Sequence, residues 1–421
     1  MDYKEALDYI HSVERFGSRP GLSRVKELLE KLGNPQKGMK FVHIAGTNGK
    51  GSCAAMCASV LKTAGYRTGL FTSPYIFHFN ERMQINGREI DNEALAKIIE
   101  KVKPVAETME DHPTEFELIT AAALLWYREE NCDVVVLEVG LGGRFDATNV
   151  IDFPEVAIIM NIGLDHMNVL GDDVEKIAFE KSGIIKPECD VVLYQQEKNV
   201  TELIRRRCEE ENARLHIADF SAIEPEFDSL MGQSFRYQDE IYALPLLGSH
   251  QLKNAAVVLE AVEVLRARGW KLEQSDVEHG IYAVSWPGRF ELINDEPAFI
   301  VDGGHNPQCA QSVRDNLLRY FPGQRRVLLI GVLRDKDYNS LTDILDEAAS
   351  EYVCISPNNP RALPAAELAE SLEKYGKNVT VCTSIADGVE AAMERAGNEG
   401  MVCAVGSLYS VGDIRDYFGM Y

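Results

Sequence analysis

The segment HIAGTNGKGS at residues 43–52 most constrains the fold of this chain, because a glycine-rich turn there joins an apolar run to a helical pattern. The run KFVHIAG before the turn is typical of a buried strand, and CAAMCASVLKTAG after it has apolar residues at helical spacing. Closely spaced backbone N–H groups, a lysine and the positive end of a helix together form a phosphate site. The segment predicts a strand–loop–helix unit of an α/β fold that binds a nucleoside triphosphate.

The turn departs in two places from the usual nucleotide-binding pattern G-x-x-x-x-G-K-[ST]. Ile44 stands where the first glycine is expected, and Gly51 separates Lys50 from Ser52. A glycine-rich turn without a ligand is the alternative, but it gives no reason for a lysine at the start of a helix. We expect ATP contacts from Gly46, Thr47, Asn48, Gly49, Lys50, Gly51 and Ser52.

Short apolar runs alternate with polar, periodic stretches along the chain, which indicates an α/β fold. The 421 residues are enough for about two to four domains. The expected strands are FVHIAG, TGLFTS, DVVVLEVG, VAIIMNIG, DVVLY, AFIVDGG, RVLLIGVL, YVCIS and MVCAVGS. Residues 223–247 resemble antiparallel hairpins, and a long helix is expected from His250 to Arg266.

The Pro-Gly pair in SWPGRFE follows a helical pattern and precedes a new series of strands. We therefore place a domain boundary near residue 287. Residues 1–287 are expected to form a P-loop ATPase domain with a mostly parallel sheet, and residues 288–421 a smaller Rossmann-like α/β domain.

Composition narrows the class of partner. The formal charge of −23 argues against a nucleic-acid or anionic-membrane surface. Nine cysteines without a C-x-x-C pair indicate reduced thiols, and no apolar stretch approaches the roughly 18 residues of a membrane span. We expect a cytoplasmic, monomeric protein that binds small molecules and neither nucleic acid nor membrane.

Glu138 is the second candidate, because it interrupts the apolar run VVVLEVG. Burying a carboxylate is costly unless a cation meets it, and Mg²⁺ beside a phosphate-binding loop would be such a cation. A core ion pair with Arg144 is the alternative. The glycines that follow also suggest a dinucleotide-binding turn, but Phe145 stands where its last glycine should be.

Three more polar residues lie near expected element ends. Ser73 follows a strand and precedes Pro74. Its hydroxyl could coordinate or orient a metal ion, or it could simply form a hydrogen bond within the turn. His166 follows a later strand, where a lone histidine is more often structural. Lys181 lies near a helix end, where a solvated charge is the ordinary interpretation.

Taken together, these segments resemble the bifunctional dihydrofolate synthase/folylpolyglutamate synthase family of the Mur ligase superfamily over nearly the whole chain. The similar runs are GTNGKGS, TSPYIFHFNERMQING, TEFE, LEVGLGGRFDATN, LDHMNVLG, EKSGIIK, QLKNAA, PGRFE, DGGHNP, DKD and GSLYSVGDIR. DGGHNP has Gly303 where alanine is commoner in the family, a change that we expect to be tolerated beside Asp302.

The resemblance implies the site. Two Mg²⁺ ions would be bound by Ser52, Ser73, Glu138, His166 and Lys181, and Lys181 would be carbamylated. Lys50, Lys181 and His166 would be the catalytic residues. ATP, as co-substrate, would also contact Asn254, Arg289, Asp302 and His305. Residues 288–421, as the C-terminal ligase domain, would contribute to the binding of both ATP and glutamate. The folate would lie near Ser18, Arg19, Pro20, Thr114, Glu115, Phe116, Glu117, Phe145, Asp146 and Ala147.

The implied reaction is ATP-dependent addition of L-glutamate to a folate carboxylate through an acyl phosphate. Cations are needed because the carboxylate and the γ-phosphate repel one another. Whether dihydropteroate is also a substrate stays open, since both reactions use one site. A Mur-type ligase for another carboxylate is the nearer alternative, although only about 40 residues precede the loop, which disfavours an N-terminal nucleotide-sugar domain. A non-catalytic P-loop nucleotide switch is the remote alternative. A GTPase of that kind should carry an N-K-x-D guanine signature, and the sequence has none.

Overall fold

The computed structural model describes residues 1–13 and 21–420. It divides into two compact units. The first contains Met1–Ile223, Tyr237–Tyr242 and Lys253–Val284, and the second contains Glu224–Arg236, Ala243–Leu252 and Ser285–Tyr421. The second unit thus takes in two short pieces that precede residue 287, and the expected domains 1–287 and 288–421 stay a prediction.

An eight-stranded sheet forms the centre of the first unit. Its strands, in spatial order, are β4 (Arg88–Glu89), β3 (Met83–Ile85), β2 (Thr68–Phe71), β5 (Val134–Glu138), β1 (Phe41–Ala45), β6 (Val156–Ile159), β7 (Asp190–Leu193) and β8 (Arg214–Ile217). The last six are parallel to one another, and β3 pairs in antiparallel fashion with both β2 and β4. β1, β5 and β6 are buried at every position, as expected for parallel strands covered on both faces.

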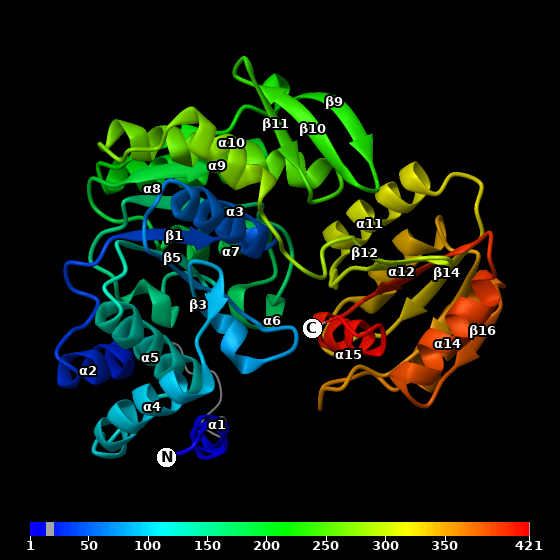
Figure 1. Ribbon diagram of the computed structural model, residues 1–421, viewed down its shortest axis with the longest axis horizontal. Helices are drawn as coiled ribbons and strands as arrows, with labels where there is room; N and C mark the ends of the chain where they lie inside the picture. Colours follow the sequence, from blue (N-terminus) through cyan, green and yellow to red (C-terminus); the bar gives the residue numbers. More distant parts are fainter. Residues whose placement is uncertain (14–20, 421) are drawn as a thin grey trace. The chain divides into compact units, whose positions relative to one another are not determined.

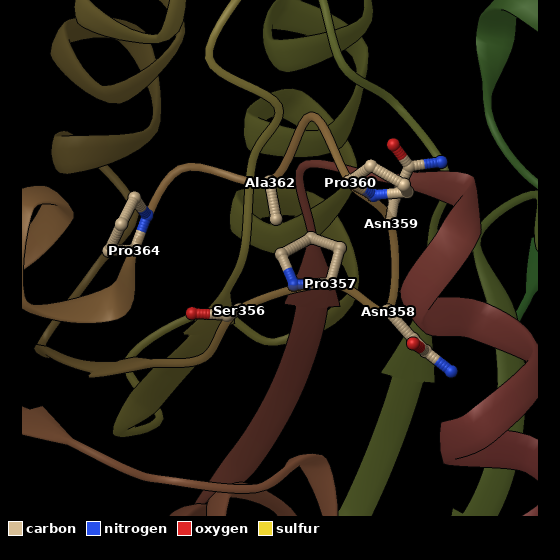
Figure 2. Close-up of a pocket in the computed structure, with 7 residues that line it drawn as sticks. All are labelled: Ser356, Pro357, Asn358, Asn359, Pro360, Ala362 and Pro364. Atoms are coloured by element: carbon tan, nitrogen blue, oxygen red, sulfur yellow. The ribbon is translucent and has the colours of Figure 1, made fainter.

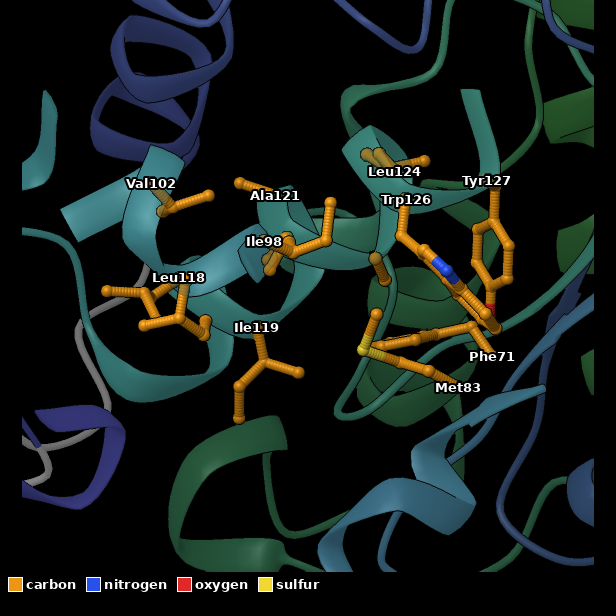
Figure 3. Close-up of a cluster of buried hydrophobic side chains, with 14 of the residues drawn as sticks. Phe71, Met83, Ile98, Val102, Leu118, Ile119, Ala121, Leu124, Trp126 and Tyr127 are labelled. Carbon is orange, nitrogen blue, oxygen red and sulfur yellow. The ribbon is translucent and has the colours of Figure 1, made fainter. Parts of the chain in front are cut away.

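Helices cover both faces of this sheet (Figure 1). The unit contains α1 (Tyr3–Ser12), α2 (Ser23–Lys31), α3 (Lys50–Thr63), α4 (Asn92–Glu107), α5 (Glu115–Glu129), α6 (Met167–Leu170), α7 (Val174–Ser182), α8 (Lys198–Glu210), most of α9 (Ser249–Ala267), and α10 (Gln274–Tyr282), with short 3₁₀ turns η2 (Phe79–Arg82), η3 (Ala147–Val150) and η4 (Phe220–Ala222). α4 and α5 pack on one face of the sheet around the apolar cluster of Figure 3, where Phe71 and Met83 of the strands meet Tyr127 of α5. This core fixes the strand ends that carry the candidate site.

A six-stranded sheet forms the centre of the second unit. Its order is β12 (Glu291–Asp295), β13 (Ala298–Val301), β17 (Met401–Val405), β14 (Arg326–Ile330), β15 (Glu351–Cys354) and β16 (Val379–Val381), with only β12 antiparallel. Its helices are α11 (Pro307–Tyr320), α12 (Tyr338–Asp346), α13 (Ala365–Leu372), α14 (Ile385–Ala396) and α15 (Leu408–Tyr417), with η5 (Glu373–Tyr375). This arrangement is the expected smaller Rossmann-like α/β unit.

The expected hairpins form a separate three-stranded sheet in the order β11 (Glu240–Leu244), β10 (Gly232–Tyr237) and β9 (Glu224–Ser229). All nine strands expected from apolar runs are present, as β1, β2, β5, β6, β7, β13, β14, β15 and β17. The predicted fold class is therefore confirmed. Among the described residues, no helix combines the length and the apolar character needed to cross a bilayer.

Candidate active site

The candidate residues of the first unit gather at one edge of its sheet. β2, β5, β1 and β6 are four consecutive neighbours, and all four run in the same direction. Their carboxyl ends are followed by Ser73, by the 139–146 loop, by the glycine-rich loop and by the loop carrying His166. Ligands of open α/β sheets bind outside such carboxyl ends.

Two glycines give the loop after β1 its shape. Gly46 and Gly49 have φ values of 154° and 84°, a region that favours glycine. A Cβ on Gly46 would stand 2.6 Å from Cβ of Met160, and one on Gly49 would stand 2.7 Å from Oδ1 of Asn254. Asn254 of α9 therefore lies directly against the loop, although about 200 residues separate the two in sequence.

The rest of the loop is held by the segment after β6. The backbone N–H of Thr47 donates to the carbonyl of Asn161 at 2.7 Å, and its hydroxyl donates to the carbonyl of Gly163 at 3.0 Å. Nζ of Lys50 donates to the carbonyl of Thr47 at 3.2 Å, so this cation folds back over its own loop at the first turn of α3. Loop, lysine and helix end form the cradle that phosphate groups require.

Glu138 is the last residue of β5 and pairs in register with Ile44 of β1. Its carboxylate is buried, and one oxygen accepts the N–H of Ser73 at 3.1 Å. Ser52 is likewise buried, on α3 two residues after Lys50. The alternative partner Arg144 instead pairs with Glu180 at 3.2 Å. Hydroxyl and carboxylate oxygens are the ligand types that Mg²⁺ prefers.

Lys181 is buried, and its Nζ donates to the carbonyl of Gly46 at 2.8 Å. The interpretation as a solvated helix charge is therefore wrong. Burial, and secondly the charge of Lys50, lower the pKa of Lys181 to about 7. Amphipathic spacing could not reveal this, because Lys181 lies near the end of α7 and the loop that covers it comes from distant sequence.

Two glycines let the 139–146 loop approach the end of α7. A Cβ on Gly143 would stand 2.8 Å from the carbonyl oxygen of Glu180, and one on Gly183 would stand 2.4 Å from Cα of Arg144. The N–H of Arg144 donates to that same Glu180 carbonyl at 2.8 Å. This contact fixes the helix turn that carries Lys181 beside the strand that carries Glu138.

His166 lies in the loop after β6, with a left-handed φ of 50°, and its side chain is 41% exposed. Its backbone N–H donates to Oδ1 of Asp165 at 2.8 Å. Among the described residues, no three His, Cys, Asp or Glu side chains cluster as metal ligands. The implied metal set is of another kind, because it combines two serines and a modified lysine with Glu138 and His166.

The Thr114–Glu117 segment begins α5 with a capping box, in which Thr114 and Glu117 bond to each other's backbone N–H. The Glu117 carboxylate is buried and also accepts Nε of Arg24 at 2.9 Å. Phe116 packs against Gly140, where a Cβ would stand 2.5 Å from the ring. Ser18, Arg19 and Pro20 lie outside the described residues. Arg24 was not among the sequence candidates, since it looks like an ordinary helix charge.

Asp146 belongs to a buried chain of hydrogen bonds. Its Oδ1 accepts the Thr148 hydroxyl at 2.5 Å, and Nε2 of His43 lies 2.9 Å from that hydroxyl oxygen. Because the hydroxyl donates to Asp146, Nε2 must carry the imidazole proton. Burial raises the pKa of Asp146, while burial and the Lys186 charge lower the pKa of His43 to about 3. Phe145 and Ala147 flank Asp146, and Phe145 is 44% exposed. Sequence analysis missed His43, although a histidine within a buried strand is a signal.

In the second unit, Asp302 follows β13 and is buried. Its two oxygens accept the N–H groups of Phe290 at 2.8 Å and Gly304 at 2.6 Å, and burial raises its pKa. Arg289 donates to the carbonyl of Gly288 at 3.0 Å. His305 lies next to these residues, with Nδ1 3.0 Å from the carbonyl oxygen of Gly303.

Gly303 occupies a crowded position in this group. A Cβ there would stand 2.2 Å from Cδ2 of Leu408, so the glycine leaves room for the start of α15. This contact explains in physical terms how the chain accommodates its departure from alanine.

Comparison with known proteins supplies the family. Residues 44–262 match the Mur ligase middle domain, and residues 288–408 match the Mur ligase, glutamate ligase domain. The dihydrofolate synthase/folylpolyglutamate synthase of Bacillus subtilis is 36% identical, with 98% of each chain covered. This chain belongs to the dihydrofolate synthase/folylpolyglutamate synthase family of Mur ligases. It is accordingly an ATP-dependent ligase.

Solved structures of the family agree over the full length. The folylpolyglutamate synthase of Mycobacterium tuberculosis, complexed with ADP and AMPPCP, has a TM-score of 0.91 at 31% identity, with 100% of each chain covered. The Escherichia coli FolC in complex with DHPP and ADP has a TM-score of 0.88 at 29% identity, covering 100% of this chain and 98% of that one. The family expected from the sequence motifs is therefore confirmed.

Proposed function

We propose that this ligase adds L-glutamate to the carboxylate of a folate, and that it also joins glutamate to dihydropteroate. The observation that carries the proposal is the sheet edge where the glycine-rich loop, Glu138 and buried Lys181 meet. The folate carboxylate attacks the γ-phosphate of ATP, giving an acyl phosphate and ADP. The glutamate amine then attacks the acyl carbon, loses a proton and displaces phosphate.

We propose that Lys50 and the loop N–H groups hold the phosphates of ATP. Lys50 already lies over the loop, so a short swing of its side chain brings the ammonium to a bound phosphate. Asn254 touches the same loop and is the expected further contact from the first unit. Arg289, Asp302 and His305 are proposed contacts from the second unit.

The oxygen donors at the sheet edge fit magnesium, with Ser52, Ser73 and Glu138 as proposed ligands and His166 and Lys181 completing two sites. The Glu138 carboxylate is buried and accepts the backbone N–H of Ser73, and Ser52 is buried at the start of α3; carboxylate and hydroxyl oxygens are hard ligands that suit Mg²⁺. Bound there, Mg²⁺ would neutralise charge on the phosphates and on the attacking carboxylate.

Lys181 fits this set only after modification, because an ammonium repels a metal ion. We propose that its Nζ carries a carbamate, which turns the cation into an oxygen donor. The depressed pKa supports this, since a carbamate forms on the neutral amine and a pKa of about 7 leaves much of the amine neutral at ordinary pH.

We propose that two short segments, Thr114–Glu117 and Phe145–Ala147, line the folate site. Phe116 and Phe145 offer ring surfaces, and Phe145 is 44% exposed. The carboxylates of Glu117 and Asp146 are engaged by Arg24 and Thr148, so we assign these two residues to shaping the site.

We also propose that the protein is monomeric and that it is located in the cytoplasm. The nine free cysteines support the cytoplasmic location.

The test is ADP release measured with ATP, Mg²⁺ and L-glutamate against a panel of acceptors. We expect activity with tetrahydrofolate and with dihydropteroate, and none with a sugar-peptide acceptor of the wall-building Mur enzymes. Release with the sugar-peptide alone would favour the alternative Mur-type ligase. Release with tetrahydrofolate but not dihydropteroate would restrict the proposal to tail extension.

A further inference from the structure

Arg289, a proposed ATP contact of the second unit, lies on a turn at residues 288–291 that leads into β12. We propose that Arg415 of α15 is a positioning residue for ATP, because it holds Glu291 and so fixes the turn that carries Arg289. This inference rests on the proposed function, since it takes Arg289 as a contact of ATP.

The backbone of this turn is strained. Phe290 has a φ of 45°, in the left-handed region that bulky residues rarely adopt. Its side chain is nevertheless buried, with its ring 5.8 Å from the ring of Tyr320 on α11. A strained conformation of this kind persists only where the surrounding contacts impose it. The direction in which Arg289 leaves the backbone therefore depends on the groups that hold the turn.

Asp302 holds the turn from one side. Its Oδ2 accepts the N–H of Phe290 at 2.8 Å, and the neighbouring N–H of Gly303 donates to the carbonyl of Gly288 at 2.9 Å. Nη1 of Arg289 donates to that same carbonyl at 3.0 Å. A Cβ on Gly303 would stand 3.0 Å from Nη1, so the guanidinium lies directly against this glycine. The shape of the turn thus sets the position of the guanidinium.

Glu291 holds the turn from the other side. Its Oε2 accepts the N–H of Gly288 at 2.8 Å, and its Oε1 accepts Nη1 of Arg415. The side chain of Arg415 is only 7% exposed. A hydrogen bond between two charged groups is strong, and removing the cation leaves the carboxylate without its partner. Loss of Arg415 should therefore release Glu291 and weaken its bond to Gly288.

One face of α15 lies along this group of residues. Leu408 and Arg415 are seven residues apart in α15, which is about two helical turns, so they share a face of the helix. Leu408 packs against Gly303, where a Cβ would stand 2.2 Å from its Cδ2, and Arg415 contacts Glu291. The helix thus supports the proposed ATP contacts near both of its ends.

The end of α15 is fixed independently of the turn. The carbonyl of Arg415 accepts the N–H groups of Phe418 and Met420 at 3.0 Å each. The ring of Phe418 lies 5.0 Å from the ring of Phe299 in β13. Arg415 therefore acts from a fixed position, and preorganisation of this kind lowers the entropy lost when a ligand binds.

A cavity of about 450 Å³ lies in the same unit, after β15 (Figure 2). The seven residues that line it, 356–360, Ala362 and Pro364, are all uncharged, whereas a planar cation such as arginine suits a phosphate. Within this unit we therefore assign the phosphate contact to Arg289 rather than to the cavity.

The test measures the KM for ATP and the KM for tetrahydrofolate separately in Arg415→Met, with ADP release as the readout. The KM for ATP should rise about tenfold, as for loss of a hydrogen bond to a charged group, while the KM for tetrahydrofolate stays within about twofold of wild type. The kcat at saturating ATP should be retained, because Arg415 acts on ATP only through the turn. Arg415→Lys keeps a cation for Glu291 and should restore most of the ATP affinity.

Arg289→Ala provides the coupling measurement. Alone, it should raise the KM for ATP. In that background, Arg415→Met should change the KM for ATP by less than about twofold, because the guanidinium that it positions is gone. A further rise of about tenfold in the double variant would show that Arg415 affects ATP by another route, and would overturn the inference. So would an unchanged KM for ATP in Arg289→Ala alone.

Two more variants separate positioning from general stability. Glu291→Gln removes the same ion pair from the other side and should raise the KM for ATP as Arg415→Met does, so it tests the inference even where Arg415→Met does not fold. Arg395→Met is the matched control, because Arg395 pairs at 3.0 Å with Glu351, a buried carboxylate at the amino end of β15. It should lower the melting temperature and leave the KM for ATP unchanged. An equal rise of that KM in Arg395→Met would mean that any loss of stability in this unit has the same effect, and would overturn the inference.

A KM for ATP within about twofold of wild type in both Arg415→Met and Glu291→Gln would also overturn it. So would an equal rise in the KM for tetrahydrofolate, which would show a general disturbance of the enzyme. These results leave the proposed function intact. That function fails separately, if the wild-type enzyme releases no ADP with any folate acceptor.

Discussion

Nζ of Lys181 donates a 2.8 Å hydrogen bond to the carbonyl of Gly46, so a buried amine supports the loop that we expect to hold ATP. Lys50 adds a second cation nearby and lowers the pKa of Lys181 further. Such an arrangement serves catalysis at the expense of stability.

We therefore expect Lys181→Met to raise the free energy of unfolding at pH 7 in CO₂-free buffer without magnesium. The folded pKa of about 7 lies below the ordinary 10.5, so the unfolded chain binds more protons between these values. Wild-type stability should then rise from pH 7 towards pH 10.5, and the variant should lose this slope. Denaturant titrations at several pH values measure it, with Lys176→Met as the exposed control on the same helix. A less stable Lys181→Met would contradict the expectation.

Lys181→Ala should be nearly inactive, because the proposed carbamate oxygen is lost. Added acetate should restore part of the ADP release, since a small carboxylate can take the vacated position. Full activity without acetate would refute a role for the lysine. Bicarbonate-dependent activity of the wild-type enzyme is a second readout, expected only if the amine is carbamylated.

Glu138→Ala should require much more magnesium for half-maximal ADP release, because a buried oxygen donor is removed. Glu129→Ala is the control, since that carboxylate pairs with Lys101 on the exposed side of α5. The measurement is a magnesium titration at saturating ATP. An unchanged magnesium midpoint in Glu138→Ala would argue against the ligand role.

His43 should stay neutral, with its proton on Nε2, well into the acid range. Its pKa of about 3 lies below the unfolded value, so the unfolded state binds more protons and stability should fall as pH drops below about 6.5. Nitrogen-15 spectra of labelled histidine, recorded from pH 8 to pH 4, report the tautomer directly. An imidazolium signal from His43 at pH 5 would contradict the lowered pKa, whereas a neutral ring with its proton on Nδ1 would show that the bond to Thr148 runs the other way or is absent.

Arg24→Met should destabilise the protein by about 3–5 kcal/mol, because it leaves the buried Glu117 carboxylate without the cation that pairs with it. The double variant Arg24→Met/Glu117→Leu should recover part of that loss, which a double-mutant cycle measures. Lys31→Met, on the same helix with an exposed pair to Glu27, is the control. Equal stability of Arg24→Met and wild type would mean that solvent reaches Glu117.

The sequence predicted the long elements well, since runs such as VVVLE are buried on both faces and need no context to be recognised as strands. It missed β3, β4, β8, β12 and β16, which are short or partly exposed, so that their residues carry little apolar pattern. These strands form because a neighbouring edge is available for pairing, and that information is not local.

The candidate site likewise contains residues that could be predicted from the sequence and residues that could not. The glycine-rich loop and Glu138 could be found from residue type and position, because a lysine after glycines and a carboxylate in an apolar run are unusual. The burial of Lys181 and the partnership of Arg24 with Glu117 could not, since each depends on contacts between residues more than 90 apart.

The shape of the glycine-rich loop depends on Asn161 and Gly163 after β6, on Lys181, and on Asn254, all of them later in the chain than the loop itself. A ribosome-bound nascent chain that ends before α9 thus contains the complete glycine-rich motif but lacks Asn254, which lies against the loop. We therefore expect that nucleotide does not template the early folding of this protein. Truncated chains ending before residue 254 should acquire the central strands without acquiring the ability to retain ATP.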